Sequence, residues 1–167
     1  MIRDLWVPAY IGIGSNLNQP IKQLKQATEN LTMMPNSKFI KISSIYESSP
    51  LGVTDQPNFI NAVAAIITRL SAHNLLKELH KIEFKQKRVR NNEKWGPRTI
   101  DLDLLVFGSQ TIDDQVLTIP HPEIKNRNFV LKPMSDITLE LRIPGLDSIE
   151  DLLKKMENNP IKIRRLD

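Results

Sequence analysis

Residues 59–70 read FINAVAAIITRL and contain the longest apolar run of the chain, positions 62–67. β-Branched side chains are frequent in this segment and no glycine or proline interrupts it, which is typical of a β-strand. Since most positions are apolar rather than alternating, we expect this strand to lie in the middle of a sheet.

The segments on the N-terminal side of this strand carry clear strand, helix and loop signals. We expect a strand at residues 9–14, a helix between the N-cap Asn18 and Pro35, a strand at 39–48 and a loop at 49–58. The helix has a proline in its first turn and apolar residues at helical spacing. The loop holds two prolines and one glycine, which do not fit regular structure.

On the C-terminal side, Ser71 is expected to cap a second helix whose buried stripe is Leu75, Leu76, Leu79 and Ile82. The later segments are predicted as a basic loop at 85–98, a strand at 100–107, an extended hairpin partner reaching 119, a helix at 129–137, a short strand at 139–143 and a last helix at 148–158.

The predicted order is therefore β-α-β-β-α-β followed by a hairpin partner and a C-terminal appendage. Consecutive strands without an intervening helix favour antiparallel pairing, so we expect an α+β fold with a ferredoxin-like core and helices covering a largely antiparallel sheet. A length of 167 residues without an internal linker suits one domain, residues 1–167.

Composition excludes several classes of site. The chain has no cysteine, so disulfides, thiolate metal sites and cysteine nucleophiles are absent. The first eight residues lack the long apolar region of a signal peptide, and the longest apolar run is far shorter than the ~18 residues that span a bilayer. We therefore expect a cytoplasmic protein with no membrane association.

Positive charge is concentrated in one segment. Residues 81–98 contain seven cations and two anions, whereas the whole chain carries a net charge of +4, so the rest of the protein is nearly neutral. Such a patch attracts an anionic ligand. The charge alone does not distinguish a nucleotide from a nucleic acid.

Two acidic residues, Asp101 and Asp103, lie in the apolar strand at 100–107. Alternate side chains of a strand share a face, so the two carboxylates should point the same way, roughly 7 Å apart. Two buried carboxylates repel each other and lose hydration, and divalent cations bound to a polyphosphate would compensate for that cost. Oxygen ligands favour magnesium. The alternative is a strand with one wet face on which both side chains are simply hydrated.

Three arginines, Arg88, Arg90 and Arg98, precede this acidic pair. Guanidinium groups bind phosphate oxygens with two parallel hydrogen bonds and can neutralise charge on a transferring phosphoryl group. A solvated basic hairpin or an RNA-contacting loop is the alternative interpretation. Because the cluster leads directly into the acidic pair, a metal–nucleotide site accounts for both features together.

Two rings from distant segments, Phe59 and Phe129, could enclose a flat heterocycle whose polar edge is read by the amide of Asn61. Trp95 on a Gly-Pro loop is a third candidate wall. Packing in the core is the alternative for each phenylalanine. His121 is flanked by prolines and could donate a hydrogen bond to a phosphate.

The run WGPRTIDLDLL at residues 95–105 closely resembles 6-hydroxymethyl-7,8-dihydropterin pyrophosphokinases of folate synthesis. The resemblance extends from Tyr10 to about Pro144 and includes collinear motifs: IGSNL at 13–17, SSIY at 43–46, PLG at 50–52, DQP at 55–57, NA at 61–62, RVR at 88–90 and PHP at 120–122.

This resemblance implies transfer of the β,γ-diphosphate unit of ATP to the pterin hydroxymethyl group, with two magnesium ions as cofactor. It assigns metal binding to Asp101 and Asp103, and transition-state stabilisation to Arg88 and Arg98. It assigns nucleotide contacts to Glu83, Arg90, Trp95, Thr118, His121 and Arg127, and pterin contacts to Ser48, Leu51, Phe59, Asn61, Trp95 and Phe129. The implied partners are ATP and 6-hydroxymethyl-7,8-dihydropterin, with no nucleic acid, and we expect a monomer.

Three positions depart from the family pattern. Ser49 stands where proline is common, Phe59 where tyrosine also occurs, and His80 where a glutamine is expected near the adenosine. Two rival functions share part of the pattern. A nucleotidyltransferase also holds two metals with strand carboxylates, and an RNA-binding module would use the basic run, although aromatic residues make up only 5% of the chain.

Overall fold

The computed structural model describes residues 2–90 and 94–167, so residues 91–93 of the predicted basic loop lie outside the described residues. The chain order is β1 (Ile2–Ser15), α1 (Pro20–Thr32), β2 (Ser37–Ile42), β3 (Tyr46–Ser48), β4 (Phe59–Leu70), α2 (Ala72–Lys85), β5 (Asp101–Phe107), β6 (Ile112–Asp113), β7 (Thr118–Ile119), a 3-10 turn (Ile124–Asn126), α3 (Asn128–Ile137), α4 (Ile149–Lys154) and β8 (Ile163–Arg165).

One antiparallel sheet organises the molecule. Its strands run in the order β5-β1-β4-β3-β8, and β2 pairs with β4 beside β3. The predicted strand at residues 59–70 is β4, with the predicted bounds, and it pairs with β1 on one side and with β2 and β3 on the other. The ferredoxin-like βαββαβ core is thereby confirmed, with β4 in the middle of the sheet.

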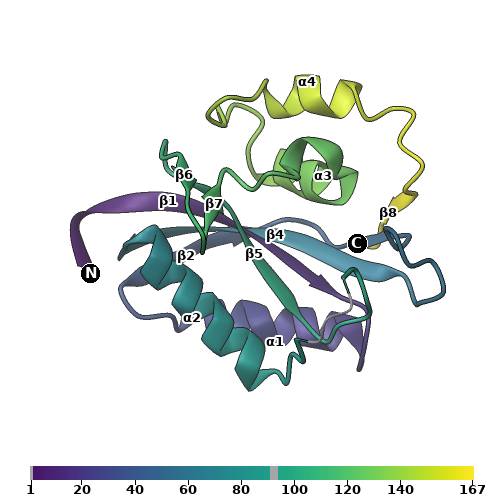
Figure 1. The fold of residues 1–167 in the computed structure, drawn as a ribbon, viewed down its shortest axis with the longest axis horizontal. Coiled ribbons are helices and arrows are strands. Elements are labelled where there is room, and N and C mark those ends of the chain that lie inside the picture. Colours follow the sequence, from purple (N-terminus) through teal and green to yellow (C-terminus); the bar gives the residue numbers. More distant parts are fainter. Residues whose placement is uncertain (1, 91–93) are drawn as a thin grey trace.

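Helices cover both faces of the sheet, α1 and α2 on one and α3 and α4 on the other (Figure 1). Alternate residues of β4 enter two separate cores: Ala62, Ala64 and Ile66 pack on the α1–α2 side, and Val63 and Ala65 on the α3–α4 side. Burial on both faces explains why β4 lacks the usual alternation of apolar and polar residues.

The second helix begins as predicted. The Ser71 hydroxyl accepts a hydrogen bond from the Asn74 amide at 3.2 Å, which satisfies a donor that the first helical turn leaves free. At α1 the prediction was wrong: Gln19 is the N-cap residue, and both Asn18 and Gln19 have positive φ. The side chain of Asn18 therefore does not cap this helix.

The predicted strand at residues 39–48 is two strands. Ile42 pairs with Ala64 and Tyr46 pairs with Asn61, so four steps along this edge match three steps of β4. The extra residue is accommodated between β2 and β3, where Ser43 exchanges hydrogen bonds with the backbone of Val63. This irregularity divides the predicted strand into two.

Two C-terminal predictions differ from the structure, and one strand was not predicted. The hairpin partner does not join the main sheet, because β6 and β7 pair with each other. Residues 139–143 form no strand; Leu141 and Ile143 pack instead into the core below α4. The tail forms β8 at the sheet edge beside β3, an element that the sequence did not suggest.

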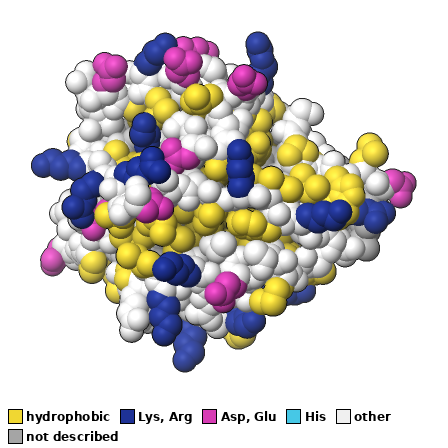
Figure 2. All heavy atoms as spheres, turned by 180° about the vertical axis from the view of Figure 1, so that it is seen from behind, with side chains coloured by type: hydrophobic (Ala, Val, Ile, Leu, Met, Phe, Trp, Pro, Cys, Tyr) yellow, Lys and Arg dark blue, Asp and Glu magenta, His cyan; other side chains and the backbone are white. Residues whose placement is uncertain are grey.

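The surface combines apolar and charged regions. The face seen in Figure 2 carries a band of hydrophobic side chains across its middle, and charged side chains border that band. Among the helices that the structure describes, none combines the length and the apolar character required to cross a bilayer.

Candidate active site

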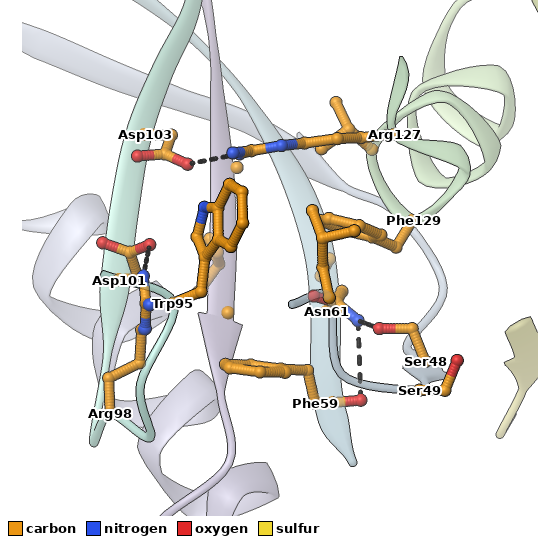
Figure 3. A pocket seen from close by; sticks show the side chains of 16 residues that line it. Ser48, Ser49, Phe59, Asn61, Trp95, Arg98, Asp101, Asp103, Arg127 and Phe129 are labelled. Atoms are coloured by element: carbon orange, nitrogen blue, oxygen red, sulfur yellow. Dashed lines mark hydrogen bonds and ion pairs between the residues drawn. The ribbon is translucent and has the colours of Figure 1, made fainter. Parts of the chain in front are cut away.

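A pocket opens on the sheet face that carries α3 (Figure 3). Its lining brings together residues from β1, β3, β4, β5, α3 and two loops: Gly12, Ile13, Gly14, Ser48, Ser49, Leu51, Phe59, Asn61, Ala62, Trp95, Arg98, Asp101, Asp103, Arg127, Phe129 and Val130.

Two glycines of β1 form the floor of this pocket. Strand register places Asp101 opposite Gly14 and Asp103 opposite Gly12, while Asn61 of β4 is opposite Gly14 on the other side. A Cβ atom at Gly14 would lie 3.5 Å from the Asn61 Oδ1 atom. Because Gly12 and Gly14 have no side chains on this face of β1, there is room between the two carboxylates and the Asn61 amide.

Arginines surround the two carboxylates. Arg98 Nη1 lies 2.9 Å from Asp101 Oδ2, and Arg88 Nη2 lies 3.9 Å from Asp101 Oδ1. Arg127 Nη1 lies 3.6 Å from Asp103 Oδ2. Burial, together with the charge of Asp101, nevertheless raises the pKa of Asp103 to about 7, against the opposing effect of Arg127. The nearby arginines therefore do not fully offset the cost of ionising Asp103, and a further positive charge would stabilise the site.

The donor set fits magnesium bound together with phosphate. The two carboxylates supply hard oxygen ligands on one strand face, and magnesium typically takes one or two carboxylates with substrate phosphates and water. Within the described residues no group of three or more acidic, histidine or cysteine side chains could hold an ion without such help.

A second acidic group adjoins the pair. Glu83 on α2 is almost fully buried, and its Oε1 lies 2.6 Å from Arg90 Nη2. Arg88 lies between the acids, with its Nε 3.9 Å from Glu83 Oε2. Burial and the charge of Asp101 raise the pKa of Glu83 to about 7. The predicted site residues Glu83, Arg88 and Arg90 are therefore joined to the pocket through Asp101, although they do not line it.

His121 is held in its neutral form. Burial, reinforced by the charge of Arg127, lowers its pKa to about 4. Its Nδ1 accepts a hydrogen bond from the Glu123 amide at 3.1 Å. With Nδ1 acting as an acceptor, the proton of the neutral ring is on Nε2, which can donate to a ligand oxygen.

The aromatic side chains form a slot with a polar end. Phe59 and Phe129 flank Asn61 in Figure 3, and Trp95 stands between them and the acidic pair. The amide nitrogen of Asn61 donates to Ser48 Oγ at 2.8 Å. This bond orients the Asn61 amide, whose oxygen is directed over Gly14 toward the pocket.

Trp95 packs closely against the loop that follows β3. Gly52 has φ +79°, and a Cβ atom there would lie 2.3 Å from Trp95 Cε3. The indole can approach the loop only because this position is glycine. Leu51, the neighbouring predicted contact, also lines the pocket.

Asn16 and Gln56 connect the loops around the pocket, a role that sequence reasoning missed. Asn16 donates to Gln56 Oε1 at 2.9 Å and accepts from the Arg98 amide at 2.8 Å. Gln56 in turn donates to the carbonyl oxygens of Val53 and Trp95, at 2.6 and 2.8 Å. The available signal was Asn16 in the motif IGSNL at residues 13–17.

Thr118 lies apart from the pocket lining. It is on β7, its side chain is exposed, and its hydroxyl donates to Asp113 Oδ1 at 3.5 Å. His80, one of the departures, lies with Nε2 4.0 Å from Glu83 Oε1.

The sequence family described as 7,8-dihydro-6-hydroxymethylpterin-pyrophosphokinase (HPPK) matches residues 10–139. The chain is 44% identical over 153 residues to the 2-amino-4-hydroxy-6-hydroxymethyldihydropteridine pyrophosphokinase of Haemophilus influenzae. The aligned region covers 92% of this chain and 95% of that protein. It is 42% identical over 144 residues to the enzyme of the same name from Pseudomonas aeruginosa, covering 86% and 88% of the two chains.

Solved structures support the same fold. The crystal structure titled Plasmodium falciparum HPPK-DHPS A437G with pteroate superposes with a TM-score of 0.75 at 15% identity, and covers 93% of this chain but 42% of that chain. At this identity the likeness concerns the fold alone.

Proposed function

The chain belongs to the 7,8-dihydro-6-hydroxymethylpterin-pyrophosphokinase family, and from that premise we propose which of its side chains carry out the reaction. The protein is a pyrophosphokinase of folate biosynthesis. It transfers the β,γ-diphosphate unit of ATP to 6-hydroxymethyl-7,8-dihydropterin. The hydroxymethyl oxygen bonds to the β-phosphorus, the bond from that phosphorus to the α,β-bridging oxygen breaks, and AMP leaves with that oxygen.

The pterin lies in the slot between Phe59 and Phe129, with its polar edge on Asn61. Stacking between two rings suits a flat heterocycle. The oriented Asn61 amide oxygen accepts hydrogen bonds from ring and exocyclic N–H groups, while Ser48 holds the amide in place. Leu51 and Trp95 close the slot from the loops, which excludes water from the reacting hydroxymethyl group.

The triphosphate lies along the acidic pair and the arginines. Asp101 and Asp103 would hold two magnesium ions, which supply charge neutralisation on the phosphate oxygens when bound. Arg98 and Arg88 are already within ion-pair distance of Asp101 and can move to oxygens of the transferring group. Glu83, Arg90, His121 and Arg127 surround this region and bind the nucleotide.

His121 acts as a hydrogen-bond donor rather than as a proton-transfer group. Its depressed pKa keeps the imidazole neutral at physiological pH, with the proton on Nε2. A neutral N–H donor can still form a charge-assisted hydrogen bond with an anionic phosphate oxygen. For Thr118, which is exposed on β7, we retain only a contact to the outer part of the nucleotide.

One observation carries the assignment: the acidic pair, Arg98, Arg127 and the polar-ended aromatic slot line a single pocket. Phosphoryl transfer requires positioning and charge neutralisation more than a strong base, and this arrangement provides both. A pterin in the slot would place its substituent toward the carboxylates.

The test is transfer of label from ATP carrying radioactive β-phosphorus. With magnesium and the pterin, we expect the label in a pterin product together with unlabelled AMP. Labelled ADP would indicate transfer of the γ-phosphoryl group, and an adenylylated product with labelled free pyrophosphate would indicate a nucleotidyltransferase. Either result contradicts the assignment. The matched controls are omission of the pterin and the Asp103→Asn variant, which should give no pterin-bound label.

We further propose that the enzyme acts as a monomer in the cytoplasm, where ATP is available. All of the proposed ligands come from one chain, so no second copy is required to complete the site. Light scattering at assay concentration tests this proposal, since a mass of about twice 19.2 kDa would contradict it.

A further inference from the structure

Ser49 is tied to the C-terminal segment by two reciprocal hydrogen bonds. Its backbone amide donates to the Lys162 carbonyl oxygen at 3.0 Å. The Lys162 amide donates to Ser49 Oγ, also at 3.0 Å. Ser49 lies between Ser48 and Leu51 on the pocket rim. The main chain of the tail therefore fixes one side of the slot.

The neighbouring tail residue is bonded to the opposite side. The Ile161 carbonyl oxygen accepts a hydrogen bond from Asn128 Nδ2 at 2.7 Å. Asn128 is the first residue of α3, directly before Phe129, and its side chain is buried. Two successive residues of the tail are thus bonded to the elements on the two sides of the slot. Lys162 is bonded to the β3 edge, where Ser48 lies opposite Phe59 of β4. Ile161 is bonded to the start of α3, directly before Phe129.

The rest of the tail secures this bridge to the sheet. Strand β8 pairs with β3, with Ile163 opposite Ser48 and Arg165 opposite Tyr46. Beyond it, the Leu166 amide donates to the Ile45 carbonyl oxygen at 2.9 Å. Figure 1 shows β8 at the end of the long connection from α4, close to the strands that border the pocket.

We propose that the segment formed by residues 161–165 is a positioning element that sets the width of the pterin slot. It holds the β3 edge, through Ser49, at a defined distance from the start of α3, through Asn128. Pre-organisation of two walls reduces the ordering cost of binding a flat ligand between them. The proposal rests on the assignment of this pocket to the pterin.

A separate contact joins β3 to α3 without the tail. The Tyr46 hydroxyl donates to the Asp136 carboxylate at 2.9 Å, which connects β3 to the far end of α3. Loss of the tail bonds should therefore loosen the slot near Phe129 while the fold persists. This separation allows a positioning role to be distinguished from a purely structural one.

The test compares two substitutions at Lys162, whose side chain is exposed and whose backbone makes both bonds. Lys162→Pro removes the amide that donates to Ser49 Oγ, whereas Lys162→Ala keeps it. We expect Lys162→Pro to raise KM for the pterin about fivefold to tenfold. The kcat and the KM for ATP should change less than about twofold, and Lys162→Ala should match the wild type. Asn128→Ala, which removes the bond to the other wall, should show the same selective rise.

Hydrogen exchange of the Ser49 amide provides a readout that does not depend on activity. In the free wild-type protein this amide should exchange slowly, and in Lys162→Pro it should exchange at least about tenfold faster. An unchanged pterin KM despite faster exchange would overturn the positioning role. A lower kcat, a similar rise in both KM values and a lower Tm would also overturn it, in favour of a structural role. If the wild type fails to bind pterin while its Ser49 amide is protected, the assignment of the pocket fails and the bridge stands.

Discussion

At the scale of single residues, each carboxylate of the acidic pair has a guanidinium partner. Arg98 Nη1 lies 2.9 Å from Asp101 Oδ2, and Arg127 Nη1 lies 3.6 Å from Asp103 Oδ2. These contacts offset part of the repulsion between the two carboxylates. If the pair holds magnesium with the nucleotide, as we propose, the ions would take over this neutralisation, and the guanidinium groups would be available to phosphate oxygens.

We expect Asp103→Asn to lower kcat by at least about 100-fold, because loss of even an outer partner of a metal ligand often costs ten- to 100-fold. The side chain is isosteric, so the fold should remain intact. Measurement of AMP release at saturating substrates, with circular dichroism as a control for folding, tests this expectation. Near-normal turnover would refute the metal role.

The raised pKa of Asp103 also predicts how stability depends on pH without metal. Its folded pKa of about 7 is above the unfolded value, so between about pH 4 and 7 the folded state binds more protons and loses stability as pH rises. Asp103→Asn removes this loss. The variant should gain about 1–2 kcal/mol relative to wild type between pH 4 and pH 8, a figure reduced because the side chain is 33% exposed. Urea denaturation in EDTA measures it; a constant difference across pH would contradict the raised pKa.

Arg98 should act mainly in the transition state. Arg98→Ala is expected to lower kcat by about 100- to 1,000-fold with a much smaller change in KM for the pterin. Arg98→Lys is the matched control, because it keeps the charge and loses the planar fork. It should recover only part of kcat. A change confined to KM in both variants would assign Arg98 to ground-state binding.

At the scale of elements, the loops around the pocket behave as one connected layer. Asn16, Gln56 and the Trp95 carbonyl link the turn after β1, the loop after β3 and the loop before β5. Movement of one loop must either break these hydrogen bonds or move the other two loops with it. Closure over the substrates is therefore expected to be concerted.

Gly52→Ala tests this layer where the loops are in closest contact. A Cβ atom would overlap Trp95 Cε3, and φ of +79° is unfavourable for alanine. We expect a rise of about tenfold in the Kd for the pterin, measured by isothermal titration calorimetry, with little change in ATP affinity. Gly145→Ala is a matched control, since that glycine also has positive φ but an added Cβ atom there would have no neighbour within 4 Å. Equal effects of the two changes on pterin binding would point to backbone strain alone.

Part of the fold and of the candidate site could be predicted from the sequence, because the signals for it are local. The apolar run of β4, the Ser71 cap and the alternation of Asp101 and Asp103 each follow from a few adjacent residues. The ends of elements were harder to predict: β2 and β3 separate because of an extra residue whose effect depends on pairing with β4. No local signal carries that register.

The parts of the site that escaped prediction depend on partners far along the chain. Gly12 and Gly14 become a pocket floor only through their register with β5 and β4. The bonds of Ser49 to Lys162 join residues 113 positions apart. The hairpin β6–β7 and the loop at 139–143 have strand-like composition, yet neither finds a place in the main sheet. Propensity describes what a segment can form, and tertiary contacts decide what it pairs with.

At the scale of the whole molecule, one sheet separates two cores. Leu24, Leu75 and Leu79 are buried on the α1–α2 side, whereas Leu131, Met134 and Ile149 are buried on the α3–α4 side. The candidate active site lies on the second side, at the edge of the second core. Both cores share β4, so each supports the strand that carries Asn61.

If the chain is one domain, as we propose, damage to either core should lower a single unfolding transition. Leu131→Ala on one side and Leu75→Ala on the other each remove a fully buried side chain, at a cost of about 2–5 kcal/mol. For a chain of this size that corresponds to a fall in Tm of roughly 5–15 °C. Calorimetry should show one transition in both variants. Because β4 contributes alternate residues to both cores, neither core can unfold without exposing the other. Two resolved transitions, with only one of them shifted by each substitution, would contradict this expectation. That result would mean that the sheet does not couple the two cores and that the α3–α4 layer unfolds as a separate unit.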